Sequence, residues 1–366
     1  MVTPFFLPQI GGVESHVYQV SKRLAGAGIN VTVLTTDLLG RLPFKEELEG
    51  ITIRRVRAWP AKQDYYFAPD IYRIIRRGGW DLIHVQCYHT LVAPTAMLAA
   101  RRAKIPYVVT FHGGGHSTRL RNALRGVQLA LLRPLLSRAE QLVAVARFEI
   151  EFFGGHLRLP PERFVYIPNG ADLPKVPHND WLTATNGTII ASVGRLERYK
   201  GHHRIMAALP YILEQRPEVR LWIAGAGPYE PALRRLARRL GVTQHVEIRS
   251  IPVTERERMA VELSKVALVV LLSEYETHPS AVLEALSLAK QVLVAATSGL
   301  SELADQGLVR AIPLECSSRQ VAAVVLDQLR HPPKTPMKLE LPTWDNCAAG
   351  LLALYQTVIE RSKCVS

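Results

Sequence analysis

Two acidic residues follow a predicted buried strand in the stretch SEYETHPSAVLEAL, residues 273–286. Glu276 comes shortly after the apolar run VALVVLL, and Glu284 stands eight positions later. Carboxylates accept hydrogen bonds from vicinal hydroxyls, such as those of a ribose or a sugar ring. The pair therefore predicts a site for a polyhydroxylated ligand, although Glu284 alone could equally serve to complement a helix dipole.

Pro279 separates the two glutamates and suits the first turn of a helix, because its missing N–H would be unpaired there. The unpaired amides at the start of this helix could hold phosphate oxygens. These amides belong to Ser280, Ala281 and Val282. Carboxylates that bind hydroxyls, beside amides that bind phosphate, fit a nucleotide sugar.

Two cations lie in VGRLERYKGHHRI, residues 193–205, which follows a predicted strand and opens a helix. Ligands of open parallel sheets bind at the carboxyl ends of the strands. The charges of Arg195 and Lys200 could therefore converge on one phosphate group. The alternative is that both are solvated surface cations.

Two glycine-rich turns stand at similar places. Gly11 and Gly12 precede a helix after a short first strand, where glycine permits close approach of a ligand and the helix N-terminus favours anions. A plain tight turn explains them equally well. Gly225 and Gly227 begin like a dinucleotide fingerprint, but Glu230 replaces its third glycine. An NAD-dependent enzyme is therefore disfavoured, although a nucleotide could still lie near this loop.

Short β-branched runs alternate with helical patterns along the chain, which predicts parallel α/β layers with strands buried on both faces. A Pro-, Asn- and Asp-rich segment at residues 168–180 interrupts the alternation and indicates a linker between two βα domains. The strands expected before it are residues 29–35, 51–56, 81–86, 106–111, 141–144 and 164–167. Those expected after it are TIIASVG, VRLWIAG, HVEIRS, ALVVLL and QVLVAA. Residues 344–363 are expected to form one amphipathic helix.

The composition is that of a globular protein, with 366 residues, 48% hydrophobic residues and a net charge of +13. This charge favours an anionic partner such as nucleic acid, anionic lipid or a phosphorylated substrate. The four cysteines form no CxxC pair and are expected to be free thiols in a reducing cytoplasm. No stretch is typical of a signal peptide or a membrane span.

Several motifs, in their order along the chain, resemble family 4 of the retaining GT-B glycosyltransferases. IGGVESHV resembles the family's N-terminal Gly-Gly loop, and DLIHVQ and TFHGG resemble two of its strand ends. IPNGAD is similar to the interdomain segment, and GRLERYKG is similar to the GRLxxxKG element. Glu276 and Glu284 match a glutamate pair with seven residues between its members. The resemblance covers almost the whole chain.

The resemblance implies an α/β GT-B fold with two Rossmann-like βαβ domains facing across a cleft. We expect residues 1–172 to form an N-terminal acceptor-binding domain and residues 173–344 to form a nucleotide-sugar-binding domain. The C-terminal helix, residues 345–366, is expected to cross back to the first domain.

The resemblance also implies roles for single residues. Arg195 and Lys200 would stabilise the diphosphate leaving group, a form of electrostatic stabilisation. Glu276 would hold the donor sugar, and Glu284 the ribose hydroxyls. The nucleotide-binding set would further include Gly225, Gly227, His278, Ser280, Ala281 and Val282.

In the first domain, the resemblance places Gly11 and Gly12 near the donor phosphates and His112 near the transferred sugar. A structural histidine at a strand end is the alternative for His112, while His84 and His116 are weaker candidates. The expected reaction transfers a hexose from a UDP- or GDP-sugar to a glycan or lipid-linked acceptor in cell-envelope synthesis, with retention of configuration. No cofactor and no metal are expected.

Some residues depart from the family pattern. Thr277, His278 and Pro279 stand where Gly-Phe-Gly is frequent, so the family's sugar preferences do not transfer. Glycine is usual at Ser250 and Ala289, and proline at Gln291. These changes could shift the backbone near the nucleotide, which keeps a non-catalytic relative open as an alternative.

The region Arg119–Arg147 is basic and carries an apolar stripe of leucines. Such a helix can lie on anionic lipid, so we expect a cytoplasmic protein that associates peripherally with the inner face of the membrane. A core-facing helix with a solvated basic face is an equal alternative. An isomerising GT-B relative, such as a sugar epimerase, is a further alternative. A nucleic-acid-binding protein is disfavoured, because only the net charge suggests it and no reader motif is present.

Overall fold

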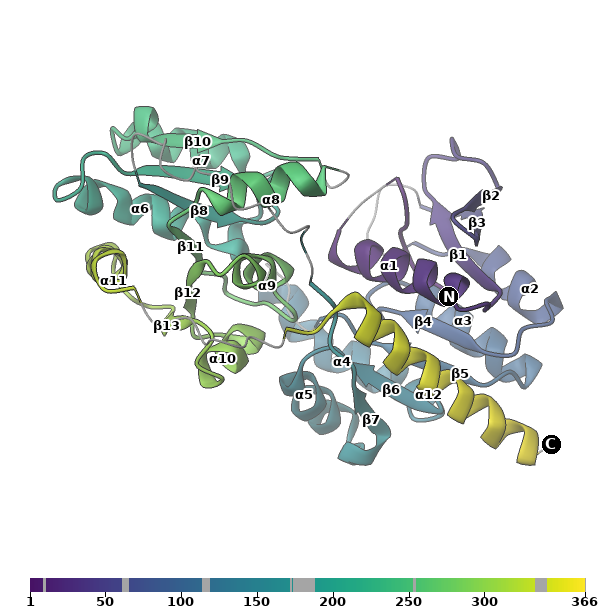
Figure 1. Cartoon of the computed structure of the whole chain (residues 1–366). Coiled ribbons are helices and arrows are strands. Elements are labelled where there is room, and N and C mark those ends of the chain that lie inside the picture. Colours follow the sequence, from purple (N-terminus) through teal and green to yellow (C-terminus); the bar gives the residue numbers. More distant parts are fainter. Residues whose placement is uncertain are drawn as a thin grey trace. The chain divides into compact units, whose positions relative to one another are not determined.

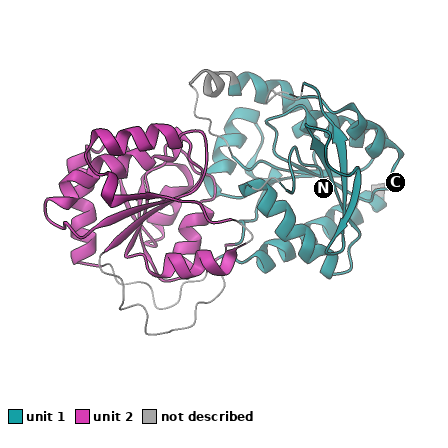
Figure 2. Ribbon diagram, turned by 90° about the horizontal axis from the view of Figure 1, so that it is seen from above, with its two compact units in different colours: residues 1–114, 120–170, 342–366 teal, residues 115–119, 171–341 magenta. Residues whose placement is uncertain are grey.

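The computed structural model describes residues 1–8, 11–60, 66–113, 119–171, 173, 188–252, 255–332 and 341–365, with the side chains of 119–124 and 365 left out. The chain divides into two units, which have separate colours in Figure 2. The first unit comprises Met1–Gly114, Leu120–Gly170 and Pro342–Ser366. The second comprises Gly115–Arg119 and Ala171–Leu341.

The first unit is built on a mostly parallel sheet (Figure 1). Its strands are β1 (Val31–Asp37), β2 (Lys45–Leu48), β3 (Ile51–Arg57), β4 (Ile83–Gln86), β5 (Tyr107–Thr110), β6 (Gln141–Ala144) and β7 (Phe164–Tyr166). They pair in the orders β2-β3-β1 and β4-β5-β6-β7, with only β2 antiparallel to its neighbour. All four residues of β4 and all four of β5 are buried, as expected for strands covered on both faces.

The strand expected before Gly11 is reduced to one residue in the described part of the chain. Val2 forms parallel bridges to Leu34 and Val85 and so joins β1 to β4. Pro4 and Pro8 lack the N–H that a ladder needs, which explains why the pairing ends there. The short first strand that the sequence predicts is thus a single bridging residue, Val2.

Helices of the first unit are α1 (Gly12–Gly26), α2 (Pro69–Arg77), α3 (Val92–Ala103), α4 (Arg119–Leu136), α5 (Arg147–Leu157) and α12 (Trp344–Val365). The C-terminal helix α12 packs against α1, far away in sequence. Its buried residues recur at helical spacing, at Cys347, Leu351, Tyr355 and Val358. The expectation that the C-terminal helix returns to the first unit is confirmed (Figure 2).

The second unit contains an all-parallel sheet with the strand order β10-β9-β8-β11-β12-β13. Its strands are β8 (Ile189–Val193), β9 (Arg220–Ala224), β10 (Val246–Ile248), β11 (Leu268–Leu271), β12 (Gln291–Ala295) and β13 (Arg310–Ile312). Numbered from β8, this is the order 3-2-1-4-5-6 of doubly wound Rossmann sheets. The strand order therefore reverses between β8 and β11, which is where such sheets bind ligands.

Helices cover both faces of this second sheet. They are α6 (His202–Leu213), α7 (Glu230–Arg239), α8 (Arg256–Ser264), α9 (Ser280–Ser287), α10 (Ser298–Asp305) and α11 (Ser318–Arg330). Successive strand residues alternate between two cores: Val270 packs with α6, α7 and α11, whereas Val269 and Leu271 pack with α8, α9 and α10. The predicted two-sided burial is confirmed, and it fixes the register of the strands and the loops that follow them.

Helix α4 carries the described part of the basic region. Leu129, Leu132 and Leu136 are buried in the core of the first unit, so much of the predicted apolar stripe faces inward. Val127 and Leu131 face outward, with 58% and 76% of their surface exposed. None of the described helices combines the length and the apolarity that crossing a bilayer requires. The four cysteines are free thiols.

Ala289 occupies a conformation that glycine adopts more easily. It follows the C-terminus of α9 with a φ of 55°, and Lys290 N–H closes the turn onto Ala285 O at 2.9 Å. A left-handed residue at this position is usually glycine. We predict that Ala289→Gly raises the free energy of unfolding by about 0.5–1 kcal/mol in urea denaturation. The exposed, helical Ala353 provides the control, because Ala353→Gly should lower it by about as much.

Candidate active site

The loops after β8 and β11 meet at the point where the strand order reverses. These strands are parallel neighbours, so their carboxyl ends lie at one edge of the sheet. Gly201 allows the contact: it has a φ of 74°, and a Cβ there would stand 1.9 Å from the carbonyl oxygen of Leu272. Glu274 N–H also donates to Tyr199 O at 2.8 Å. Only glycine at position 201 permits this close approach.

An ion pair joins the two loops. Lys200 Nζ donates to Glu276 Oε1 at 2.6 Å and to Oε2 at 2.8 Å. Ser273 Oγ donates to the same Oε1 at 2.8 Å, while Ser298 Oγ accepts from Glu276 N–H at 2.8 Å. The side chains of Lys200 and Glu276 are only 17% and 8% exposed. The structure thus brings together two predicted catalytic residues from opposite sides of the switch point.

Arg195 stands at the start of the same turn and is exposed. Its Nη2 donates to the hydroxyl of Tyr199 at 3.2 Å. The ammonium of Lys200 lies over the ring of Tyr199, 5.4 Å from its centroid. Both cations are therefore associated with one aromatic side chain, as a convergent cation pair requires.

His202 supports this turn through its two ring nitrogens. It is fully buried; its Nδ1 lies 2.8 Å from Ser192 Oγ, and its Nε2 lies 3.1 Å from the carbonyl oxygen of Arg195. A carbonyl can only accept, so Nε2 carries the proton and Nδ1 accepts from the serine. Burial lowers the pKa of His202 from 6.5 to about 4. The histidine is neutral at pH 7 and acts as a structural support.

The glycines of the GAG turn have a structural explanation of their own. A Cβ at Gly225 would stand 1.9 Å from the carbonyl oxygen of Gly194, and one at Gly227 would stand 2.6 Å from that of Leu196. Leu196 N–H also donates to Ala226 O at 2.9 Å. The two loops therefore pack backbone to backbone, so the glycines are required even without a ligand.

Glu284 lies on α9 and is paired with a residue that the sequence did not single out. Arg256 Nη2 donates to Glu284 Oε1 at 2.6 Å, and the carboxylate is only 12% exposed. Glu284 is the fifth residue of α9 and lies beyond the first turn, so the pairing with Arg256 explains its burial better than the helix dipole does.

Most of the α9 amides that were expected to bind phosphate already donate hydrogen bonds within the protein. Ser280 N–H donates to His278 O at 3.0 Å, and Val282 N–H donates to Pro279 O at 2.9 Å. Of the three amides, only that of Ala281 lacks a partner within the described part of the chain. Pro279 is the N-cap, with a φ of −80° and a ψ of 80°, and not a first-turn residue. The prediction of three free amides was therefore wrong.

His112 lies in the first unit, two residues after the end of β5 at Thr110, and has a φ of 53°, which is uncommon for a residue other than glycine. Its Nε2 lies 2.7 Å from Gln86 Oε1, and its ring meets that of His16 edge-on at 4.5 Å. His16 is itself held by Asn169 Oδ1, 2.7 Å from its Nδ1. Backbone and neighbours together fix the orientation of the His112 ring.

Gly11 and Gly12 precede and begin α1 in the same unit. Gly11 is the extended N-cap, with a φ of −144°. Nothing lies within 4 Å of a Cβ built on Gly12. Neither glycine has a left-handed backbone.

The other predicted histidines, His84, His278 and His116, lie in different surroundings. His84 is buried, with Nδ1 2.5 Å from the Tyr355 hydroxyl and Nε2 2.7 Å from Thr110 Oγ1, so it links α12 to the sheet. His278 is half-buried in the loop between the two glutamates. His116 lies outside the described residues.

Two family models cover most of the chain. The model of Glycosyltransferase Family 4 matches residues 10–175, and that of Glycosyl transferases group 1 matches residues 177–340. The chain belongs to glycosyltransferase family 4. It is a glycosyltransferase with the GT-B fold, as the resemblance of its motifs implied.

Relatives and solved structures agree with this assignment. The chain is 25% identical to the phosphatidylinositol N-acetylglucosaminyltransferase gpi3 subunit of Schizosaccharomyces pombe, over 92% of this chain and 74% of that protein. It is 26% identical to the GDP-mannose:cellobiosyl-diphosphopolyprenol alpha-mannosyltransferase of Xanthomonas oryzae, over 88% and 85%. The structure of Anabaena Alr3699/HepE in complex with UDP has a TM-score of 0.71 at 18% identity, over 98% and 96%.

Sequence reasoning missed several residues that position the glycosyltransferase site. They are Gln86, His16, Asn169, Ser192, His202, Arg256, Ser273 and Ser298. Ser273 could have been found, because it directly follows the buried strand that leads to Glu276. Arg256 and Ser298 are distant in sequence from their partners, so only the fold shows the contact.

We predict that acid destabilises this glycosyltransferase partly through His202. Between pH 6.5 and about 4 the unfolded chain binds a proton at this residue and the folded chain does not, so the free energy of unfolding falls as the pH falls. The loss amounts to about 3 kcal/mol for a complete shift of this size. In urea titrations between pH 7 and 4.5, His202→Gln should show a shallower decline than the wild type. The exposed His156, replaced by Gln, is the control; equal declines in His202→Gln and the wild type would contradict the prediction.

Proposed function

We propose that this glycosyltransferase transfers a hexose from a UDP- or GDP-sugar to a glycan or lipid-linked acceptor of the cell envelope, with retention of configuration. One observation carries the proposal: Lys200 and Glu276 meet at the switch point of the second sheet, with Arg195 on the same turn. Cations and a carboxylate in this place suit a diphosphate bonded to a sugar.

In this proposal Arg195 and Lys200 stabilise the leaving diphosphate. Negative charge grows on it as the glycosidic bond breaks, and fixed cations in a site shielded from water stabilise that charge strongly. Lys200 is already held in place by Glu276, so it loses little conformational entropy when the donor binds. The two cations supply the charge stabilisation that a metal ion provides elsewhere, and no cofactor takes part.

The carboxylates then bind hydroxyl groups. Glu276 accepts from the donor sugar, and Glu284 accepts from the ribose while Arg256 keeps it oriented. His278 lies between them in the chain and contributes to the choice of sugar. The amide of Ala281 is available to a phosphate oxygen, and Gly225 and Gly227 shape the loop beside the turn of Arg195.

The first unit contributes His112 and the Gly11-Gly12 turn. Gln86 orients the His112 ring toward the transferred sugar, and the open space at Gly12 admits the donor phosphates.

The names of relatives support both donor classes, since HepE was solved with UDP and the Xanthomonas enzyme is named for GDP-mannose. The names of the latter and of the yeast subunit support a lipid-linked acceptor. Arginines of Arg119–Arg147, with exposed Val127 and Leu131, support peripheral contact with an anionic membrane.

Calorimetric titration with UDP, GDP, ADP and dTDP tests the donor site. We expect micromolar binding of one diphosphate, and a loss of roughly tenfold or more in Glu284→Ala, because the ribose loses a charged acceptor. Glu257→Ala is the matched control, as Glu257 is an exposed acid of α8. No binding by any of the four would contradict the proposal and favour the non-catalytic alternative.

Replacement of Lys200 tests the transfer step. We expect Lys200→Met to lower kcat about 100- to 1,000-fold with the donor that titration identifies, because the leaving group loses a fixed cation. The rate is measured as release of the nucleoside diphosphate. The anomeric configuration of the product is determined separately by NMR. Lys363→Met, on the exposed end of α12, should keep full activity. Normal kcat in Lys200→Met, or an isomerised sugar without transfer, would refute the proposed roles.

A further inference from the structure

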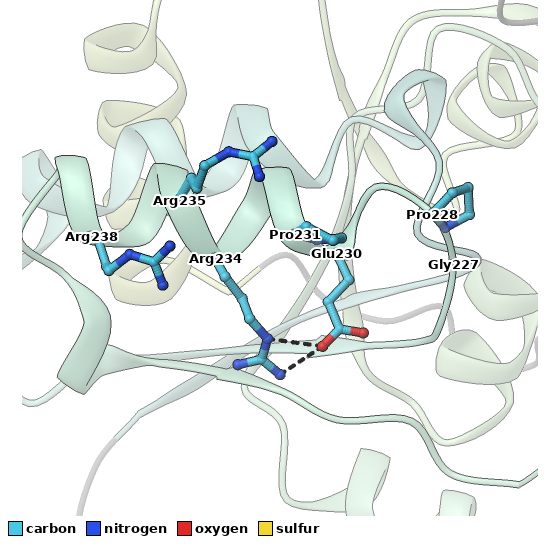
Figure 3. A pocket seen from close by; sticks show the side chains of 7 residues that line it. All are labelled: Gly227, Pro228, Glu230, Pro231, Arg234, Arg235 and Arg238. Atoms are coloured by element: carbon cyan, nitrogen blue, oxygen red, sulfur yellow. Dashed lines mark hydrogen bonds and ion pairs between the residues drawn. The ribbon is translucent and has the colours of Figure 1, made fainter.

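A basic pocket lies on the second unit beside α7. It has a volume of about 590 Å³, within the range of small-molecule sites. Its lining residues are Gly227, Pro228, Glu230, Pro231, Arg234, Arg235 and Arg238 (Figure 3). Three arginines against one acid give it a clear positive charge, and none of Arg195, Lys200, Glu276 or Glu284 belongs to its lining.

The arginines of the pocket are not equivalent. Arg234 is neutralised within its own helix: its Nε donates to Glu230 Oε1 at 2.9 Å and its Nη2 lies 2.7 Å from the same oxygen. Arg235 and Arg238 are both exposed and form no ion pair with any residue in the described ranges. Figure 3 shows the contrast, with dashed lines at Arg234 only. Two positive charges of the pocket are therefore left uncompensated.

These two charges raise the energy of the empty pocket. Arg235 and Arg238 are three positions apart on one helix, where side chains are neighbours and like charges repel. An anion between the guanidinium groups would remove this repulsion and could be bound by both forks. The helix amides contribute little, since Glu230 and Ala232 already donate theirs to Gly227 O and Tyr229 O. Recognition in this pocket thus depends on the arginine side chains.

The rest of the lining is apolar and stiff. Pro228 and Pro231 have fixed rings, Pro231 in the first turn of α7, and Gly227 is held by its contact with the Leu196 backbone. The volume exceeds that of one phosphate group, so the pocket has room for a diphosphate or for a phosphate on an organic group. We propose that it is a second anion site for a phosphate ester or diphosphate, in addition to the proposed transfer reaction and independent of it.

Isothermal titration of the whole protein with inorganic pyrophosphate tests the site, with UDP and GDP both present in saturating amounts to occupy the proposed donor site. We expect binding that weakens roughly tenfold or more in the double variant Arg235→Ala/Arg238→Ala. Arg239→Ala is the matched control, because Arg239 is a neighbouring exposed arginine outside the pocket and should keep wild-type binding. Alanine favours helix, so the double variant should fold, which circular dichroism verifies.

A second arm separates soluble phosphates from lipid headgroups. Co-sedimentation uses vesicles of phosphatidylcholine with about 30% phosphatidic acid, whose phosphate monoester has the required charge. Loss of pyrophosphate binding or of vesicle binding in the double variant supports the site. Which of the two is lost shows whether the bound phosphate comes from a soluble compound or from a lipid headgroup. Absence of both kinds of binding, or binding unchanged in the double variant, overturns the proposal. The results with UDP alone and GDP alone test the donor site, so either proposal can fail without the other.

Discussion

The ion pair between Lys200 and Glu276 is the interaction on which the site of this glycosyltransferase depends. It connects the loops after β8 and β11 across the point where the strand order reverses. A carboxylate that is 8% exposed is costly to leave without partners, and this one receives the ammonium and the hydroxyl of Ser273. Removing either charge would leave the other poorly solvated, so the pair specifies the loop arrangement as much as it adds stability.

In the proposed reaction, the same pair prepares the site for a diphosphate. Before a donor binds, Glu276 neutralises Lys200, so two cations do not have to be held together without compensation. An ammonium has three donors and can serve a phosphate oxygen while it keeps one bond to the carboxylate. Arg256 and Glu284 repeat this arrangement on α8 and α9. The site therefore consists of charges already oriented by opposite charges, which lowers the reorganisation required when the substrate arrives.

Sequence reasoning predicted the fold well because two-sided burial leaves a clear pattern. The strands around Val108 and Val270 are almost continuously apolar, and the Pro- and Asn-rich segment from Pro168 onward marked the change of unit. Sequence reasoning failed where short-range hydrogen bonds determine which amides are free. The amides of Ser280 and Val282 donate to carbonyl groups of the loop that precedes them. It also missed Arg256 and Ser298, because tertiary contact brings them to Glu284 and Glu276 and no local pattern records it.

The departure from the family pattern at Ala289 leaves the hydrogen bonds of its turn in place. Ala289 keeps the left-handed turn that glycine would adopt, with both closing hydrogen bonds formed, so α9 ends where a glycine would end it. Glu284 belongs to the same short helix and retains its partner. The strain at Ala289 costs about 1 kcal/mol and leaves the carboxylates in place. A chain that accepts this strain and still assembles both ion pairs keeps the arrangement that the proposed transfer reaction requires, which favours that proposal over a degenerate relative.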